Sequence, residues 1–64
     1  MKVKYDKEND IVYIRLNESP IAESDENKHG VIIDYAIDGS IVGIEILNAS
    51  KKLIEPGKIE YIAA

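Results

Sequence analysis

Three charged side chains are the candidates for chemistry in this chain: Arg15, Asp34 and Glu45. Each falls at an alternate position of a predicted strand, so all three project from the same face of a sheet. An arginine beside two carboxylates has the groups to bind a polar ligand or to support hydrolysis. The same residues also suit a cross-strand ion pair, which contributes little when it is exposed. The ion pair is the favoured interpretation, and a small polar site is the alternative.

The other titratable side chains form no catalytic or metal-binding motif. His29 is the only histidine, and a general base needs a partner that positions it. The absence of cysteine excludes disulfides and thiolate metal sites. Asp6, Glu8 and Asp10 have the spacing of the first calcium ligands, but Ile11 stands where such a loop needs glycine. We therefore expect no catalytic residue, no metal site and no cofactor.

Size and charge narrow the class of protein. The chain has 64 residues, which predicts a single domain over residues 1–64. Twelve acidic residues against eight basic ones give a net charge of −4, which disfavours binding to the phosphates of nucleic acids. No apolar run approaches the roughly 20 residues of a membrane span, and the first residues lack the apolar stretch of a signal peptide. We expect a soluble cytoplasmic protein that binds neither nucleic acid nor membrane.

Alternating apolar residues predict four strands that pair as two hairpins. The strands are expected at residues 2–5, 11–16, 30–35 and 41–47, with Asp38-Gly39 in the turn of the second hairpin. Residues 17–29 contain Pro20, which cannot donate a backbone hydrogen bond to a sheet, and an acidic run. We predict a long exposed acidic connection over this range.

The last part of the sequence is predicted to add a short helix. Asn48 or Ser50 can cap a helix over residues 49–55, and Pro56-Gly57 ends it. Residues 54–64 are then a tail or a fifth strand. The expected fold class is α+β and mostly β. It is an antiparallel four-stranded meander of two hairpins, with a short C-terminal helix and a possible fifth strand.

The two faces of the predicted sheet differ in composition. One is apolar or tyrosine throughout and is named the core face: Val3, Tyr5, Val12, Ile14, Leu16, Val31, Ile33, Tyr35, Val42, Ile44 and Ile46. The other, the mixed face, combines charges with large aliphatic side chains. Its candidate interaction residues are Ile11, Tyr13, Arg15, Ile32, Asp34, Ile41, Glu45 and Leu47. Gly43 on this face predicts a close approach by the Tyr13 ring, or a bulge.

The predicted helix is too short to cover the core face. A helix of two turns spans roughly 10 Å, whereas four strands span about 15 Å between their outer axes. A sheet must bury its apolar face against another layer. We therefore expect a homo-oligomer, or a small protein partner that covers the remainder.

Three segments carry a resemblance to a known family: Tyr5-Asp6, Asp10–Ile14 and Asp38–Ser50. Across about residues 1–53 the chain resembles the domain of unknown function 2283 family of small prokaryotic proteins. The resemblance implies a small β-rich fold with no assigned activity, and it supplies no catalytic residue. Some members lie beside toxin-like genes, which implies an antitoxin-like role as one candidate.

These observations predict a small non-enzymatic protein-interaction domain that forms a homodimer or binds a protein partner. One alternative is an antitoxin-like partner of a small toxin. A second alternative is a ligand-binding or hydrolytic protein that uses the polar residues of the mixed face. A concave pocket lined by Arg15, Asp34 and Glu45 would favour that second alternative.

Overall fold

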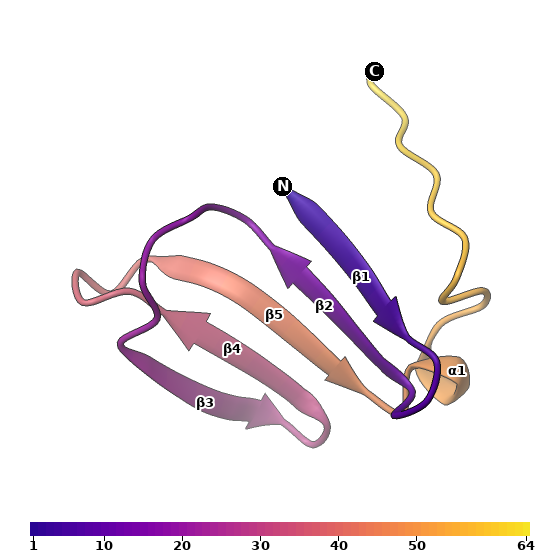
Figure 1. Ribbon diagram of the computed structural model, residues 1–64, viewed down its shortest axis with the longest axis horizontal. Coiled ribbons are helices and arrows are strands. Elements are labelled where there is room, and N and C mark those ends of the chain that lie inside the picture. The colour runs from indigo at the N-terminus through magenta and orange to yellow at the C-terminus, as the bar shows by residue number, and fades with distance from the viewer.

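The structure, a computed structural model that describes residues 1–64, is one five-stranded antiparallel sheet with a short helix at one end (Figure 1). The strands lie in the order β1-β2-β5-β4-β3. The elements are β1 (Lys2–Asp6), β2 (Ile11–Arg15), β3 (Glu23–Lys28), β4 (Val31–Tyr35), β5 (Ile41–Leu47) and α1 (Ala49–Lys52). No helix of the structure combines the length and the hydrophobicity that a membrane crossing requires.

The predicted fold class, α+β and mostly β, is confirmed, and so are both hairpins. β1 pairs with β2 and β4 pairs with β5, each antiparallel. The order of the strands differs from a simple meander, because β5 lies between β2 and β4. β5 is the longest strand, and it carries apolar side chains on both of its faces. At the centre of the sheet both edges of β5 are paired, with β2 on one side and β4 on the other.

The prediction of an exposed connection over residues 17–29 is wrong for its second half. Residues 23–28 form β3, which pairs with β4 through partners such as Ser24 with Asp34 and Glu26 with Ile32. Every residue of β3 is polar and exposed. The strand therefore has no alternation of apolar residues by which the sequence could reveal it. Acidic side chains on an edge strand discourage pairing with further chains, which explains their place here.

The fifth strand of the sheet is thus β3. The other candidate, residues 54–64, has no strand and runs from α1 as an extended tail (Figure 1). We use the word tail for these residues below. The helix is also shorter than predicted, because Leu53 already has an extended backbone at φ −110° and ψ 148°.

The N-terminus of α1 is capped from a distant turn. Asn48 adopts a left-handed backbone conformation, and its side chain makes no capping hydrogen bond. Instead, Asp10 Oδ1 accepts from the Ser50 backbone N–H at 3.0 Å and Asp10 Oδ2 accepts from Ser50 Oγ at 2.7 Å. The Ala49 backbone N–H donates to the Asp10 carbonyl at 2.9 Å. The prediction that Asn48 or Ser50 supplies the cap is therefore wrong, since a residue forty positions away does so.

The register confirms the two faces, but little of either face is enclosed. The buried apolar residues are Val12, Ala36, Val42 and Ala49, and Val42 is the largest side chain that is fully buried. The other apolar residues of the core face that lie within the strands are only half-buried. This is a single-layer sheet whose core face is still open over much of its area.

Gly43 lies between Arg15 and Asp34 in the register of the sheet. A Cβ atom at this position would stand 3.0 Å from the Ile14 carbonyl oxygen and 3.4 Å from Asp34 Oδ2. The pairing of β4 with β5 also shifts register between Asp34 and Tyr35. Glycine is therefore needed for close approach of the neighbouring backbone and carboxylate beside a bulge, whereas the Tyr13 ring is not among the nearest groups.

Candidate functional site

An apolar groove of ≈ 590 Å³ lies over part of the core face, between the sheet and the segment that follows α1. The sheet contributes side chains such as Val3, Ile14 and Ile46, and the following segment contributes Leu53, Ile54 and Ile59. Eight of the twelve residues that line it are hydrophobic, while Lys52, Glu55 and Lys58 supply its charges. A groove of this composition suits an apolar partner surface with a polar rim.

The groove lies on the face opposite to the predicted interaction residues. The sequence assigned its sheet residues to the core face, which the helix was expected to cover only in part, and it assigned residues 54–64 as a tail or a fifth strand. One signal for the groove was available, namely Ile59, Tyr61 and Ile62 in a tail that no element was expected to cover. The groove is thus the functional feature that the residue pattern did not single out.

The predicted interaction residues share the mixed face, except that the register shift beside Tyr35 sets Ile41 opposite that core-face residue. The register sets Ile11 opposite Leu47, and it sets Tyr13 and Ile32 on either side of Glu45. Tyr13 and Ile41 are exposed, whereas Asp34 is buried at 6% exposure. No pocket of the structure is lined by Arg15, Asp34 or Glu45.

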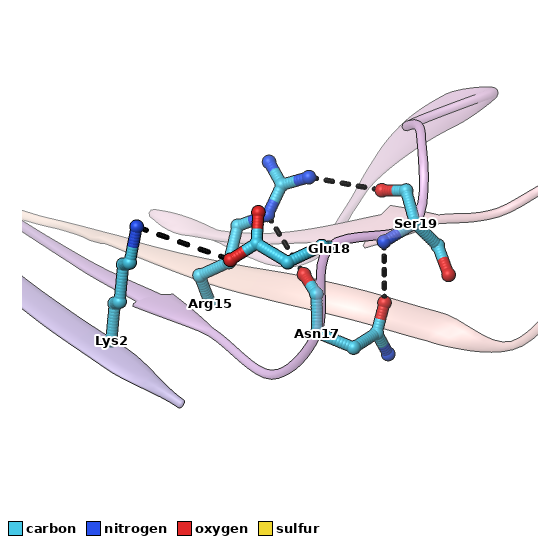
Figure 2. Close-up of polar contacts among 5 residues, drawn as sticks. All are labelled: Lys2, Arg15, Asn17, Glu18 and Ser19. Atoms are coloured by element: carbon cyan, nitrogen blue, oxygen red, sulfur yellow. Dashed lines mark hydrogen bonds and ion pairs between the residues drawn. The ribbon is translucent and has the colours of Figure 1, made fainter.

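Arg15 does not pair with the carboxylates of the mixed face. Its Nε atom donates to the Asn17 carbonyl at 2.9 Å and its Nη2 atom donates to the Ser19 carbonyl at 2.9 Å (Figure 2). Asn17 Oδ1 accepts from the Ser19 backbone N–H, and Lys2 forms an exposed ion pair with Glu18 at 3.9 Å (Figure 2). The predicted cross-strand ion pair is therefore wrong. Arg15 instead binds two backbone carbonyls of the connection that follows β2 and holds that connection against the end of the strand.

Because Arg15 binds elsewhere, Asp34 and Glu45 are left as neighbouring carboxyl groups on the mixed face. Ser24 Oγ donates to Asp34 Oδ1 at 2.6 Å, which joins β3 to β4. Partial burial, followed by repulsion from Asp34 and a hydrogen bond with it, raises the pKa of the Glu45 carboxyl above its ordinary value. The mixed face therefore has one carboxyl with a raised pKa, that of Glu45, and no group of three or more possible ligands gathers to hold a metal ion.

We expect Glu45→Gln to raise the melting temperature at pH 7 and to leave it unchanged at pH 3. The folded chain holds the Glu45 proton more tightly than the unfolded chain, because the pKa is raised on folding. That stabilisation is complete below the ordinary glutamate pKa of about 4.3 and is lost as the pH rises through the raised value. Glutamine cannot ionise, so the variant avoids the loss.

Thermal melts at the two pH values, followed by circular dichroism, test this expectation. Glu60→Gln, in the exposed tail, is the matched control and should melt with the original chain at both pH values. If Glu45→Gln melts at or below the original chain at pH 7, the carboxyl pair does not carry the proposed penalty.

A second polar cluster joins α1 to the first hairpin. Tyr5 OH donates to Asp10 Oδ1 at 2.8 Å, on the same carboxylate that caps α1 through Ser50. The hydrogen bonds from Ser50 and then from Tyr5 hold the pKa of Asp10 below its ordinary value. Ala49 is fully buried at this corner. The cluster therefore anchors α1 and does not form a reaction centre.

Together, the fold and the two polar clusters define a small single-sheet α+β protein with an open apolar face. The family described as "Protein of unknown function (DUF2283)" matches residues 2–50, and the chain belongs to this family. The resemblance drawn from the sequence is confirmed, and the tail lies outside the matched range. No match was found among curated proteins or among solved structures.

Proposed function

We propose that the chain is a small protein-interaction domain that forms a homodimer through its core face. The observation that carries the proposal is an excess of accessible surface. The chain of 7.1 kDa exposes 5021 Å², whereas a compact monomer of that mass exposes about 4,100 Å². The excess of about 900 Å² is close to the roughly 800 Å² that each partner buries in a standard interface.

The composition of the excess surface also supports a second copy as the occupant. Ile54 is 100% exposed at the rim of the groove, and Ile59, Tyr61 and Ile62 are exposed in the tail beyond it. Exposed apolar side chains gathered beside an apolar groove mark an interaction surface. Domains of this size rarely reach stability from one small core alone, and self-association is one way to add to it.

A different protein partner, such as a small toxin, is the alternative occupant of the core face. No contact in the structure favours such a partner over a second copy. The ligand-binding or hydrolytic alternative depended on one pocket lined by Arg15, Asp34 and Glu45. The groove and the smaller hollow near residues 19–22 and 36–38 are lined by other residues. The proposed compartment is the cytoplasm, since a chain without cysteine is compatible with a reducing environment.

Sedimentation velocity at micromolar concentration tests the homodimer. We expect a species of twice 7.1 kDa for the original chain and a species of 7.1 kDa for Ile54→Asp. Ile54 is fully exposed within one chain, so the substitution removes nothing from that chain's own core. A charge placed in a buried apolar interface is very costly, and the dimer should dissociate.

Ile37→Asp is the matched control. Ile37 is 93% exposed in the turn between β4 and β5, at the end of the sheet away from α1 (Figure 1). This variant should remain a dimer, and circular dichroism should show the same strand content in all three proteins. An original chain that sediments only at 7.1 kDa, or an Ile54→Asp variant that stays dimeric, would exclude this interface.

A further inference from the structure

We infer that the tail of each chain lies across the core face of the partner chain and completes it. This inference rests on the proposed homodimer and specifies which segment of the second copy occupies the open face. It assigns to residues 54–64 the role of an exchanged arm, held by apolar contacts and by an ion pair at the β3 edge of the partner sheet, where the arm enters.

Most of the tail is exposed in its own chain. Its first residues border the groove and Gly57 lies beside Tyr5, but Ile54, Tyr61 and Ile62 are exposed. Its one backbone hydrogen bond, from the Lys58 N–H to the Glu55 carbonyl, is local, and none joins it to the sheet. Figure 1 shows the tail leaving α1 and running beside β1, on the side of β1 away from β2. Ile59 and Tyr61 alternate with Glu60, which is the pattern of an extended segment covered on one side. A covering surface is therefore required from elsewhere.

The tail is long enough to cross a complete sheet. The chain is extended at Leu53, just before the tail, and turns between Glu55 and Lys58. Residues 58–64, beyond that turn, span up to about 25 Å when fully extended, at up to about 3.6 Å per residue. Five strands span about 19 Å between their outer axes. A tail that enters at one edge of the partner sheet can therefore reach the opposite edge.

The part of the core face over β3 and β4 lies outside the groove. The sheet residues that line the groove come from the N-terminal residue, β1, β2 and β5, so β3 and β4 contribute nothing to it. Val31 and Ile33 are only half-buried there. The tail of a second copy would place its apolar side chains over these two residues, and the buried apolar area would drive the contact.

Charge complementarity sets the direction of the tail. Glu23 and Asp25 lie opposite Tyr35 and Ile33 in the register, so both acidic side chains stand on the core face at the β3 edge. Both are exposed, and neither is part of an ion pair. Lys58 is the basic residue of the tail. An ion pair between Lys58 and Asp25 of the other copy would fix the register of the exchanged arm.

A cysteine exchange experiment tests the inference, because the chain contains no cysteine that would interfere. Lys58→Cys and Asp25→Cys replace the proposed ion pair at two exposed positions. Equal amounts of the two variants, one of them tagged, are mixed and oxidised under mild conditions. We expect most of the protein to form the mixed disulfide of two chains. Lys58→Cys mixed with Glu8→Cys, which lies in the exposed turn after β1, should form none.

The double variant with Lys58→Cys and Asp25→Cys in one chain separates exchange from self-closure. We expect a disulfide-linked species of twice 7.1 kDa on a non-reducing gel. An internally bridged chain of 7.1 kDa would show that the tail closes its own sheet, and it would overturn the inference. Absence of any bridge in a chain that still sediments as a dimer would overturn the exchange but keep the proposed function. A monomeric original chain would overturn the proposed function itself.

Discussion

Val42→Asp is expected to abolish folding at 25 °C. Val42 has 0% exposure and is the largest side chain that the sheet encloses completely. An unpaired charge in such a site costs several kcal/mol. The whole stability of a chain of this length is roughly 3–10 kcal/mol. Far-ultraviolet circular dichroism should therefore lose the strand signal of the original chain.

Ile41→Asp is the matched control for this prediction. Ile41 precedes Val42 in β5 and is 43% exposed. The variant should keep the strand signal, because an exposed aspartate retains its hydration. Loss of structure in both variants would mean that the two positions of β5 are equally enclosed, contrary to the burial seen here.

Asp10→Ala is expected to cause the largest fall in melting temperature among single substitutions of charged residues. The change removes the acceptor of three hydrogen bonds, from Tyr5 OH, Ser50 N–H and Ser50 Oγ. It also places alanine at φ 55°, a left-handed conformation that aspartate and asparagine tolerate better. Asp10→Asn should fall between alanine and the original chain, because asparagine keeps one acceptor oxygen and tolerates this conformation.

Asp10 also determines how the stability of this corner changes with pH. The pKa of Asp10 is lowered on folding, so its contribution is present above the ordinary aspartate pKa and is lost as the pH falls through the lowered value. The difference in melting temperature between the original chain and Asp10→Asn should therefore shrink in acid. Glu8→Ala, in the exposed turn after β1, is the control, and an Asp10→Ala variant that melts with it would show that α1 needs no anchor.

This anchor also explains the residues by which the chain resembles its family. Tyr5 and Asp10 come from the first resembling segments, and Ala49 and Ser50 come from the last. They meet at one corner, where Asp10 holds both the Tyr5 hydroxyl and the start of α1. These four residues of the shared pattern are thus accounted for by the construction of the fold.

The four apolar strands and their two faces could be predicted from the residue pattern alone. A strand that buries one face must alternate along its own length, and this constraint is local, so Ile11–Arg15 and Ile41–Leu47 display it directly. The Asp38-Gly39 turn is equally local, since its left-handed glycine at φ 86° is required within the turn itself. The same reasoning found the mixed face, whose members lie together apart from Ile41.

The tertiary structure alone decided which groups meet. β3 is an exposed edge strand, held by backbone hydrogen bonds to β4 that require no apolar side chain, so its composition resembles that of a loop. Arg15 binds the carbonyls of Asn17 and Ser19, and every residue carries such an acceptor. Asp10 caps a helix forty residues away, and its role depends on the packing of the first hairpin against the chain after β5. Partners of this kind are set by the meeting of distant segments, which a local pattern of residue types does not encode.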